Sequence, residues 1–167
     1  MNLSSAVGAC GAIALLFTTS LHAAEPTCRV IRVQDGDSLT CLSPSKQRIE
    51  VRLADLDAPE SAQPYGQLAQ LQLFCLVYNK EIRLEVVKQT RYGLKVARVY
   101  LGDLYVNDAM VRQGSAWAYD EGKGDSRLPA LEAEARSLQR GLWGLPQAEI
   151  VPPWQWRSER SSRLSSR

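Results

Sequence analysis

RVIRVQDGDSLTCL, residues 29–42, consists of two short runs of apolar and β-branched residues on either side of a polar turn. Arg29–Val33 and Ser38–Leu42 each have the composition of a strand, and the turn between them contains the pair Asp35-Gly36. Asp-Gly between two such runs favours a tight reversal of the chain, because glycine adopts the backbone angles that the turn requires. The stretch therefore predicts a β-hairpin.

A third strand and an acidic loop follow the hairpin. Ile49–Leu53 alternates apolar with polar side chains after a Ser-Pro turn sequence, as a strand with one buried face does. The next residues, 55–60, read DLDAPE and are called the carboxylate loop below. The third strand thus leads directly into a cluster of acidic side chains.

The middle of the chain predicts one helix and two further strands. Gly66–Tyr78 follows Pro64 and carries apolar residues at helical spacing. Ile82–Val86 and Val96–Tyr100 have strand composition, with Tyr92-Gly93 as the turn between them. These two strands bring the expected total to five.

Two helices are expected near the end. Asn107 can cap a short helix that ends at Gly114, and Pro129 opens a longer one. The longer helix carries an apolar stripe of Leu131, Ala135, Leu138 and Leu142. Five strands with one helix after the third and two at the end are typical of an oligonucleotide-binding barrel. We expect an α+β fold, mainly β: a five-stranded OB-fold barrel with three helices.

The chain has 167 residues, enough for one domain with short extensions. Residues 1–23 contain no Lys, Arg, Asp or Glu, and their apolar run is too short to span a bilayer comfortably, which is typical of a secretory signal peptide. A retained membrane anchor is the alternative. We expect the domain to occupy residues 27–146, and residues 147–167, a Pro/Trp segment with a basic tail, to be disordered after Arg157. The protein is then expected to be secreted or periplasmic, monomeric, and without stable membrane insertion after cleavage.

Histidine and cysteine counts restrict the chemistry. His22 is the only histidine and lies in the expected signal peptide, so proteases and nucleases that depend on histidine are excluded for the mature chain. Cys28, Cys41 and Cys75 remain, and their spacing matches no zinc site. A disulfide between Cys28 and Cys41 across the hairpin is one expectation, and three small buried side chains are the other.

Several segments together resemble the staphylococcal nuclease family. They are VQDGDSL at 33–39, RLADLDAPE at 52–60, Tyr92-Gly93, VNDAMVRQG at 106–114 and, as in exported bacterial members, PPWQWR at 152–157. These segments occur in the family's order over residues 28–157. Trp143, Trp154 and Trp156 are expected to pack the C-terminal end against the barrel.

The resemblance implies a nuclease that hydrolyses DNA and RNA with one calcium ion per domain. By position, Asp37 and Asp57 match metal-binding carboxylates, and the carbonyl of Ala58 matches a further ligand. Glu60 matches the residue that positions or deprotonates water, and Arg52 matches a phosphate-binding arginine. This set suits the reaction, because a phosphodiester needs cations to absorb charge and a carboxylate to direct water.

One departure leaves the function open. Tyr92 matches a tyrosine near the substrate phosphate, but the family's second arginine, two positions later, is Leu94 here. Arg91 or Lys95 could compensate. The net charge is only +2, so any attraction for nucleic acid must be local. The two hypotheses are a metal-dependent endonuclease of low sequence specificity, weakened by Leu94, and an inactive module that binds nucleic acid or protein.

Overall fold

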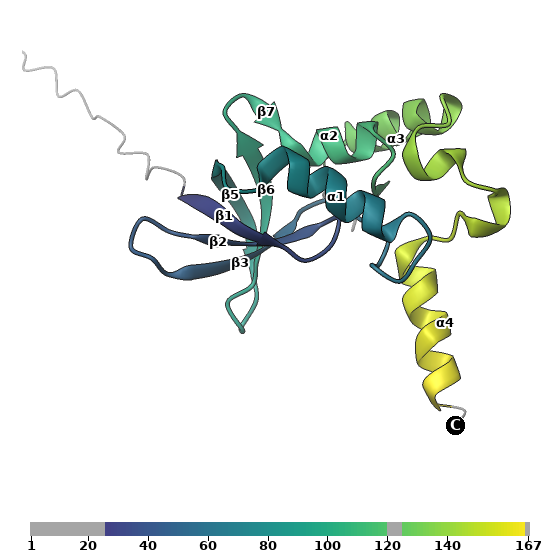
Figure 1. Ribbon diagram of the computed structural model, residues 1–167, viewed down its shortest axis with the longest axis horizontal. Helices are drawn as coiled ribbons and strands as arrows, with labels where there is room; N and C mark the ends of the chain where they lie inside the picture. The colour runs from purple at the N-terminus through teal and green to yellow at the C-terminus, as the bar shows by residue number, and fades with distance from the viewer. Residues whose placement is uncertain (1–25, 120–124, 166–167) are drawn as a thin grey trace, which may run out of the picture.

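The computed structural model describes residues 26–119 and 125–165 (Figure 1). The expected signal peptide, residues 1–23, lies outside the described residues. Within the described ranges, no helix has both the length and the apolar composition needed to cross a membrane.

A closed barrel of five strands forms the body of the protein (Figure 1). The strands are β1 (Thr27–Val33), β2 (Ser38–Leu42), β3 (Arg48–Leu53), β5 (Glu81–Gln89) and β6 (Lys95–Leu101). Neighbouring strands run in the order β3-β2-β1-β5-β6, and parallel pairing of β3 with β6 closes the sheet on itself. The OB-fold barrel expected from the sequence is confirmed.

Alternation along β3 shows how the barrel sorts its side chains. Val51 and Leu53 are buried in the core, whereas Glu50 is exposed and Arg52 is half-buried on the opposite face. Successive side chains of a strand point to opposite faces, so filling the core with the two apolar residues sends Arg52 outward. The strand pattern therefore presents Arg52 at the barrel surface.

Three short strands were not expected from the sequence. β7 (Leu104–Tyr105) pairs antiparallel with β6, while β4 (Leu56–Asp57) pairs with β8 (Trp117–Ala118) in a separate two-stranded sheet. Elements of two residues are too short to give a periodic pattern. The β4–β8 pairing matters for the site, because it sets Asp57 opposite Trp117.

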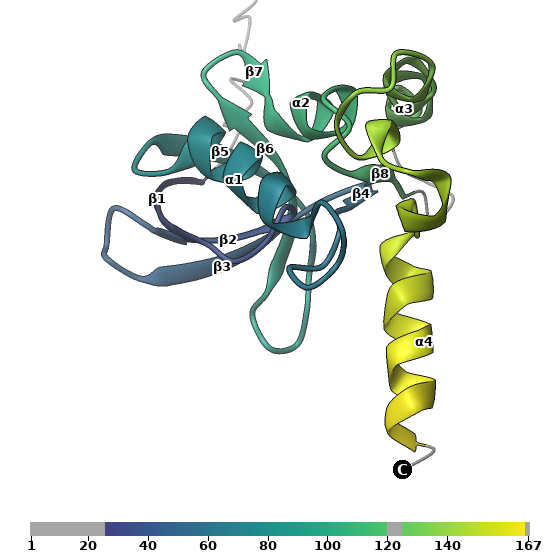
Figure 2. The ribbon, with the colours of Figure 1, turned by 45° about the vertical axis from the view of Figure 1, so that its right-hand side comes forward.

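Helices lie beside the barrel, and the last of them extends away from it (Figures 1 and 2). They are α1 (Gly66–Val77), α2 (Val106–Arg112), α3 (Leu128–Ser137) and α4 (Pro153–Ser165), with two 3₁₀ turns, η1 (Gly141–Gly144) and η2 (Gln147–Glu149). The first three are the expected helices. In the expected stripe of the third, however, Leu138 is exposed because α3 ends at Ser137, and Leu128 is buried instead.

Asn107 does not cap α2, contrary to expectation. It lies inside the helix and is fully buried. Its Oδ1 accepts a hydrogen bond from the N–H of Val99 (3.0 Å), and its Nδ2 donates to the carbonyl of Ala54 (2.8 Å). Asn107 therefore joins α2 to β6 and to the residue just before the carboxylate loop.

The C-terminal tail is helical rather than disordered, which corrects the sequence-based expectation. α4 begins at Pro153, a residue suited to the first turn of a helix, and extends away from the barrel (Figures 1 and 2). Gln155 donates a hydrogen bond to Glu159 (3.0 Å), one turn later, which supports the exposed helix. Contacts of Trp154 and Arg157 with the barrel end, described below, fix its first turn, and composition alone does not reveal them.

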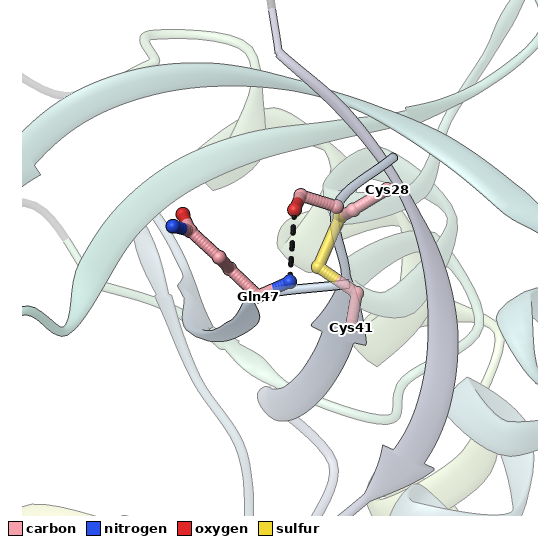
Figure 3. The surroundings of a disulfide bond; sticks show 4 residues. Cys28, Cys41 and Gln47 are labelled. Carbon is pink, nitrogen blue, oxygen red and sulfur yellow. Dashed lines mark hydrogen bonds between the residues drawn. A yellow bond between two sulfur atoms is a disulfide. The ribbon is translucent and has the colours of Figure 1, made fainter. Parts of the chain in front are cut away.

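A disulfide joins β1 to β2 (Figure 3). Cys28 and Cys41 are both buried and form the bond, whereas Cys75 is a free, exposed thiol. The disulfide expectation is confirmed. Closing a loop of this length typically stabilises a fold by about 3 kcal/mol, mainly because it lowers the conformational entropy of the unfolded chain.

Candidate active site

The β1–β2 turn holds Asp37 in place. Asp35 Oδ1 accepts hydrogen bonds from the backbone N–H of Asp37 (3.1 Å) and from the hydroxyl of Ser38 (2.6 Å). Gly36 is needed for a close approach, since a Cβ there would lie 2.7 Å from the Cβ of Ala58. The turn is thus packed directly against the carboxylate loop.

Arg52 bridges two buried carboxylates. Its Nη2 donates to Asp37 Oδ2 (3.1 Å) and to Asp57 Oδ1 (3.2 Å). The side chains of Asp37 and Asp57 are only 5% and 3% exposed, whereas that of Arg52 is 42% exposed. Burial alone would lower the pKa of Arg52, but the two carboxylates raise it above its ordinary value, so the guanidinium stays charged.

A second guanidinium reaches the same carboxylates from α4. Arg157 Nη2 donates to Asp57 Oδ2 (2.6 Å), and its Nη1 donates to Asp57 Oδ1 (3.1 Å) and Glu60 Oε1 (2.8 Å). The hydrogen bonds to Asp57 raise the pKa of Arg157 well above its ordinary value. Sequence analysis missed Arg157 as a site residue. The only indication was its place at the end of the PPWQWR segment.

A cleft of about 200 Å³ opens beside these groups. Its lining residues are Asp35, Asp37, Ser38, Arg52, Ala58, Glu60 and Leu94. Four expected site residues, Asp37, Arg52, Ala58 and Glu60, therefore meet at one cleft, and Asp57 joins them through Arg52.

The β5–β6 turn contributes less than the sequence suggested. Leu94 lines the cleft, but Tyr92, Arg91 and Lys95 do not. Tyr92 is 82% exposed, and the Arg91 guanidinium lies over its ring at 4.6 Å. The structure thus brings neither the expected phosphate-binding tyrosine nor either compensating cation to the carboxylates.

Comparison with known proteins assigns the family. The family model described as "Staphylococcal nuclease homologue" matches residues 50–144, more than half of the chain. The chain belongs to the staphylococcal nuclease family.

Similar proteins include several named as nucleases. An "Uncharacterized endonuclease" of Escherichia coli O157:H7 is 38% identical over 146 residues, covering 87% of this chain and 94% of the relative. A "Micrococcal nuclease" of Shigella flexneri is 39% identical over 139 residues, covering 77% of this chain and 78% of the relative. An "Uncharacterized endonuclease" of Haemophilus influenzae is 38% identical, covering 90% of this chain and 85% of the relative. Family and relatives together support a nuclease.

The donors of this staphylococcal nuclease family member suit a hard cation. Among residues 26–119 and 125–165, no three His, Cys, Asp or Glu side chains are grouped closely enough to form a metal site by themselves. Asp37 and Asp57 nevertheless direct one oxygen each at the same nitrogen of Arg52, so they converge on a point that positive charge already occupies. Ca²⁺ prefers such carboxylate oxygens and completes its shell with carbonyls and water. The oxygen donors therefore fit Ca²⁺ in kind.

The environment of Asp37 makes the metal-free fold sensitive to pH. Burial raises the pKa of Asp37 from 3.8 to about 7, although Arg52 opposes the change. The folded protein therefore holds this proton more tightly than the unfolded chain does. The contribution of Asp37 to stability is largest below pH 3.8, falls as the pH rises towards 7, and is constant above that.

Asp37→Asn is expected to stabilise the metal-free protein at pH 8 by about 1 to 3 kcal/mol, because it removes a buried charge. At pH 4 the difference should nearly vanish. Urea unfolding with a chelator at both pH values measures this effect. Equal free energies of unfolding for parent and variant at pH 8 would contradict it. Asp35 accepts two hydrogen bonds within the turn, so Asp35→Asn would disturb the turn and is a poor control. Asp103→Asn, at an exposed position, is the control instead.

Proposed function

We propose that this protein is a calcium-dependent endonuclease that hydrolyses phosphodiester bonds of DNA and RNA with low sequence specificity. The observation that carries the proposal is the meeting of Asp37, Arg52 and Glu60 at one cleft, with Asp57 joined to them through Arg52. A fold that served only as a scaffold would gain nothing from burying two carboxylates beside each other, since burial of charge costs free energy.

Asp37, Asp57 and the carbonyl of Ala58 would hold Ca²⁺. When bound, the ion would supply positive charge where the phosphate gains negative charge. Arg52 has a partly exposed side chain that lines the cleft, and it would donate hydrogen bonds to the phosphate oxygens, for which its planar geometry is suited.

Glu60 would act on the attacking water. Its side chain is 36% exposed and lines the cleft, so a water molecule can lie between it and a bound phosphate. The water oxygen forms a new bond to phosphorus while its proton passes to the Glu60 carboxylate. The bond from phosphorus to the leaving oxygen breaks, and that oxygen takes a proton from solvent.

The disulfide supports an extracytoplasmic location. Structural disulfides persist in oxidising compartments such as the periplasm, and Cys28 and Cys41 form one here. Together with the composition of residues 1–23, it favours a secreted or periplasmic location. We further propose that the protein is a monomer with its domain at 27–146.

Cleavage assays with the purified protein test the proposal. Single-stranded DNA, duplex DNA and RNA should all be cut at many sites with Ca²⁺, and none should be cut with a chelator. Cleavage that persists in the chelator would contradict the calcium dependence, and absence of cleavage with Ca²⁺ would contradict the enzyme.

Leu94 supports a second candidate, a nucleic-acid-binding module without catalysis. A leucine in the cleft wall cannot donate to phosphate. In that case the parent would bind oligonucleotides without cutting them, and Leu94→Arg alone would gain cleavage.

A further inference from the structure

Aromatic packing at the start of α4 holds Arg157 at the site. Pro153 is buried, and the ring of Trp154 lies 6.5 Å from that of Trp117 and 5.4 Å from that of Tyr119. Trp117 is itself paired with Asp57 across the β4–β8 sheet. The aromatic contacts thus anchor the start of α4 beside the strand that carries Asp57.

A second contact fixes the segment just before α4. The side-chain amide of Gln63 donates a hydrogen bond to the carbonyl of Val151, and Gln63 is buried. The Oε1 atom of Gln63 also accepts a hydrogen bond from the N–H of Glu60 (3.1 Å). One side chain therefore links the backbone of Glu60 to the approach of α4, so Arg157 and Glu60 are positioned together.

Two arginines and Glu60 are the partly exposed side chains around the buried aspartates. The side chains of Arg157 and Arg52 are 43% and 42% exposed, whereas Asp37 and Asp57 are 5% or less. A phosphate that approaches this end of the barrel would therefore find more exposed surface on the two arginines than on either aspartate. Such an arrangement favours a polyanion.

Asp57 cannot keep both of its hydrogen-bonded contacts with Arg157 and also coordinate a cation. Arg157 now contacts both of its carboxylate oxygens. Once Asp57 gives an oxygen to a cation, the Arg157 guanidinium loses part of that contact but remains tethered beside Glu60. Arg157 does not itself line the cleft, but its partner Glu60 does, so a phosphate bound there would lie next to this contact and across from the uncharged Leu94.

We propose that Arg157 is the second phosphate-binding arginine of this active site, supplied by α4 in place of the arginine that is Leu94 in this chain. The inference deepens the proposed nuclease function and rests on it. Arg157 approaches from the C-terminal helix, so the charge needed at the phosphate is restored from a different part of the chain.

Four variants test the inference: Arg157→Ala, Arg157→Lys, Leu94→Arg and the double variant Leu94→Arg/Arg157→Ala. Arg157→Ala should lower kcat for single-stranded DNA with Ca²⁺ by about 100-fold, the usual effect of losing one charged donor. The kcat of Arg157→Lys should lie between those of the parent and Arg157→Ala, because an ammonium keeps the charge but not the planar pair of donors. Arg160→Ala, an exposed arginine of the same helix, is the matched control and should change kcat less than threefold.

The double variant separates a role at the phosphate from a structural one. Leu94→Arg should raise kcat at least tenfold in the Arg157→Ala protein and have little effect in the parent, since the two arginines would act on one phosphate. If Arg157 only stabilised the fold, Leu94→Arg would not rescue its loss. Urea unfolding of each variant verifies that it is folded.

Binding supplies a measurement that does not depend on turnover. With Ca²⁺, Arg157→Ala should weaken the affinity for a short phosphorothioate single strand, a slowly cleaved probe, about tenfold, and Arg160→Ala should weaken it less than twofold. Unchanged affinity and kcat in Arg157→Ala would overturn the inference. Faster cleavage by Arg157→Ala would also overturn it, because α4 would then block the site. If the parent does not cleave but Arg157→Ala still loses affinity, the proposed catalysis fails while the phosphate contact stands.

Discussion

Glu60→Gln is expected to lower the calcium-dependent cleavage rate about a thousandfold. The amide has nearly the same shape as the carboxylate, so its oxygen can still accept the hydrogen bond from Arg157, but it cannot take a proton from water. General-base catalysis typically contributes 10²- to 10⁴-fold in rate. Single-turnover cleavage of a labelled single strand, with Ca²⁺ at saturation, measures the chemical step directly.

The control for this experiment is Glu50→Gln, an exposed glutamate on β3 that takes no part in the cleft. It should cleave at the parent rate. Both variants should unfold within about 1 kcal/mol of the parent, since exposed ion pairs stabilise little. A Glu60→Gln protein that retains more than a tenth of the parent rate would remove Glu60 from the mechanism.

Asn107→Ala is expected to destabilise the fold by about 3 to 5 kcal/mol. The change removes the side-chain hydrogen-bond partner of two buried backbone groups, the N–H of Val99 and the carbonyl of Ala54. Each buried polar group left without a hydrogen bond costs about 1 to 3 kcal/mol, and the cavity adds to this. Urea unfolding measures the loss, which is a large part of the stability of an ordinary domain.

A second substitution at this position separates packing from hydrogen bonding. Asn107→Leu keeps much of the volume but neither hydrogen bond, so it should remain destabilised by at least about 2 kcal/mol. Asp103→Ala, in the exposed β6–β7 turn, should change the free energy of unfolding by less than about 0.5 kcal/mol. A leucine variant as stable as the parent would show that filling the space at Asn107 suffices.

The strands of the barrel could be predicted because each carries its pattern locally. Alternation in Ile49–Leu53 and the Asp-Gly turn after Val33 are properties of neighbouring residues, and β3 and the β1–β2 hairpin formed where expected. The same holds for the carboxylate loop, which is contiguous in sequence. Asn107 was misplaced because a polar residue near a helix start usually caps it, and only its hydrogen bonds to Val99 of β6 and to Ala54 reveal the buried role.

The site residues could be predicted where they belong to short contiguous motifs of the family. Asp37, Arg52, Ala58 and Glu60 meet at the cleft as expected, but Tyr92 is exposed and does not line it, and no local pattern indicates which way a turn residue faces. The composition of the tail predicted disorder because it is rich in serine and arginine. A tertiary contact overrides that tendency by anchoring the first turn of α4.

The amino-acid sequence alone thus specified the barrel strands, the carboxylate loop and the family, since these depend on periodicity and on motifs within short segments. Only the tertiary structure placed Arg157 on Asp57, 100 positions away in sequence. That contact depends on Trp154 packing against Trp117 and on the pairing of β4 with β8. Long-range packing of this kind leaves no repeat in the sequence, so the second guanidinium of the site becomes visible only once the chain is folded.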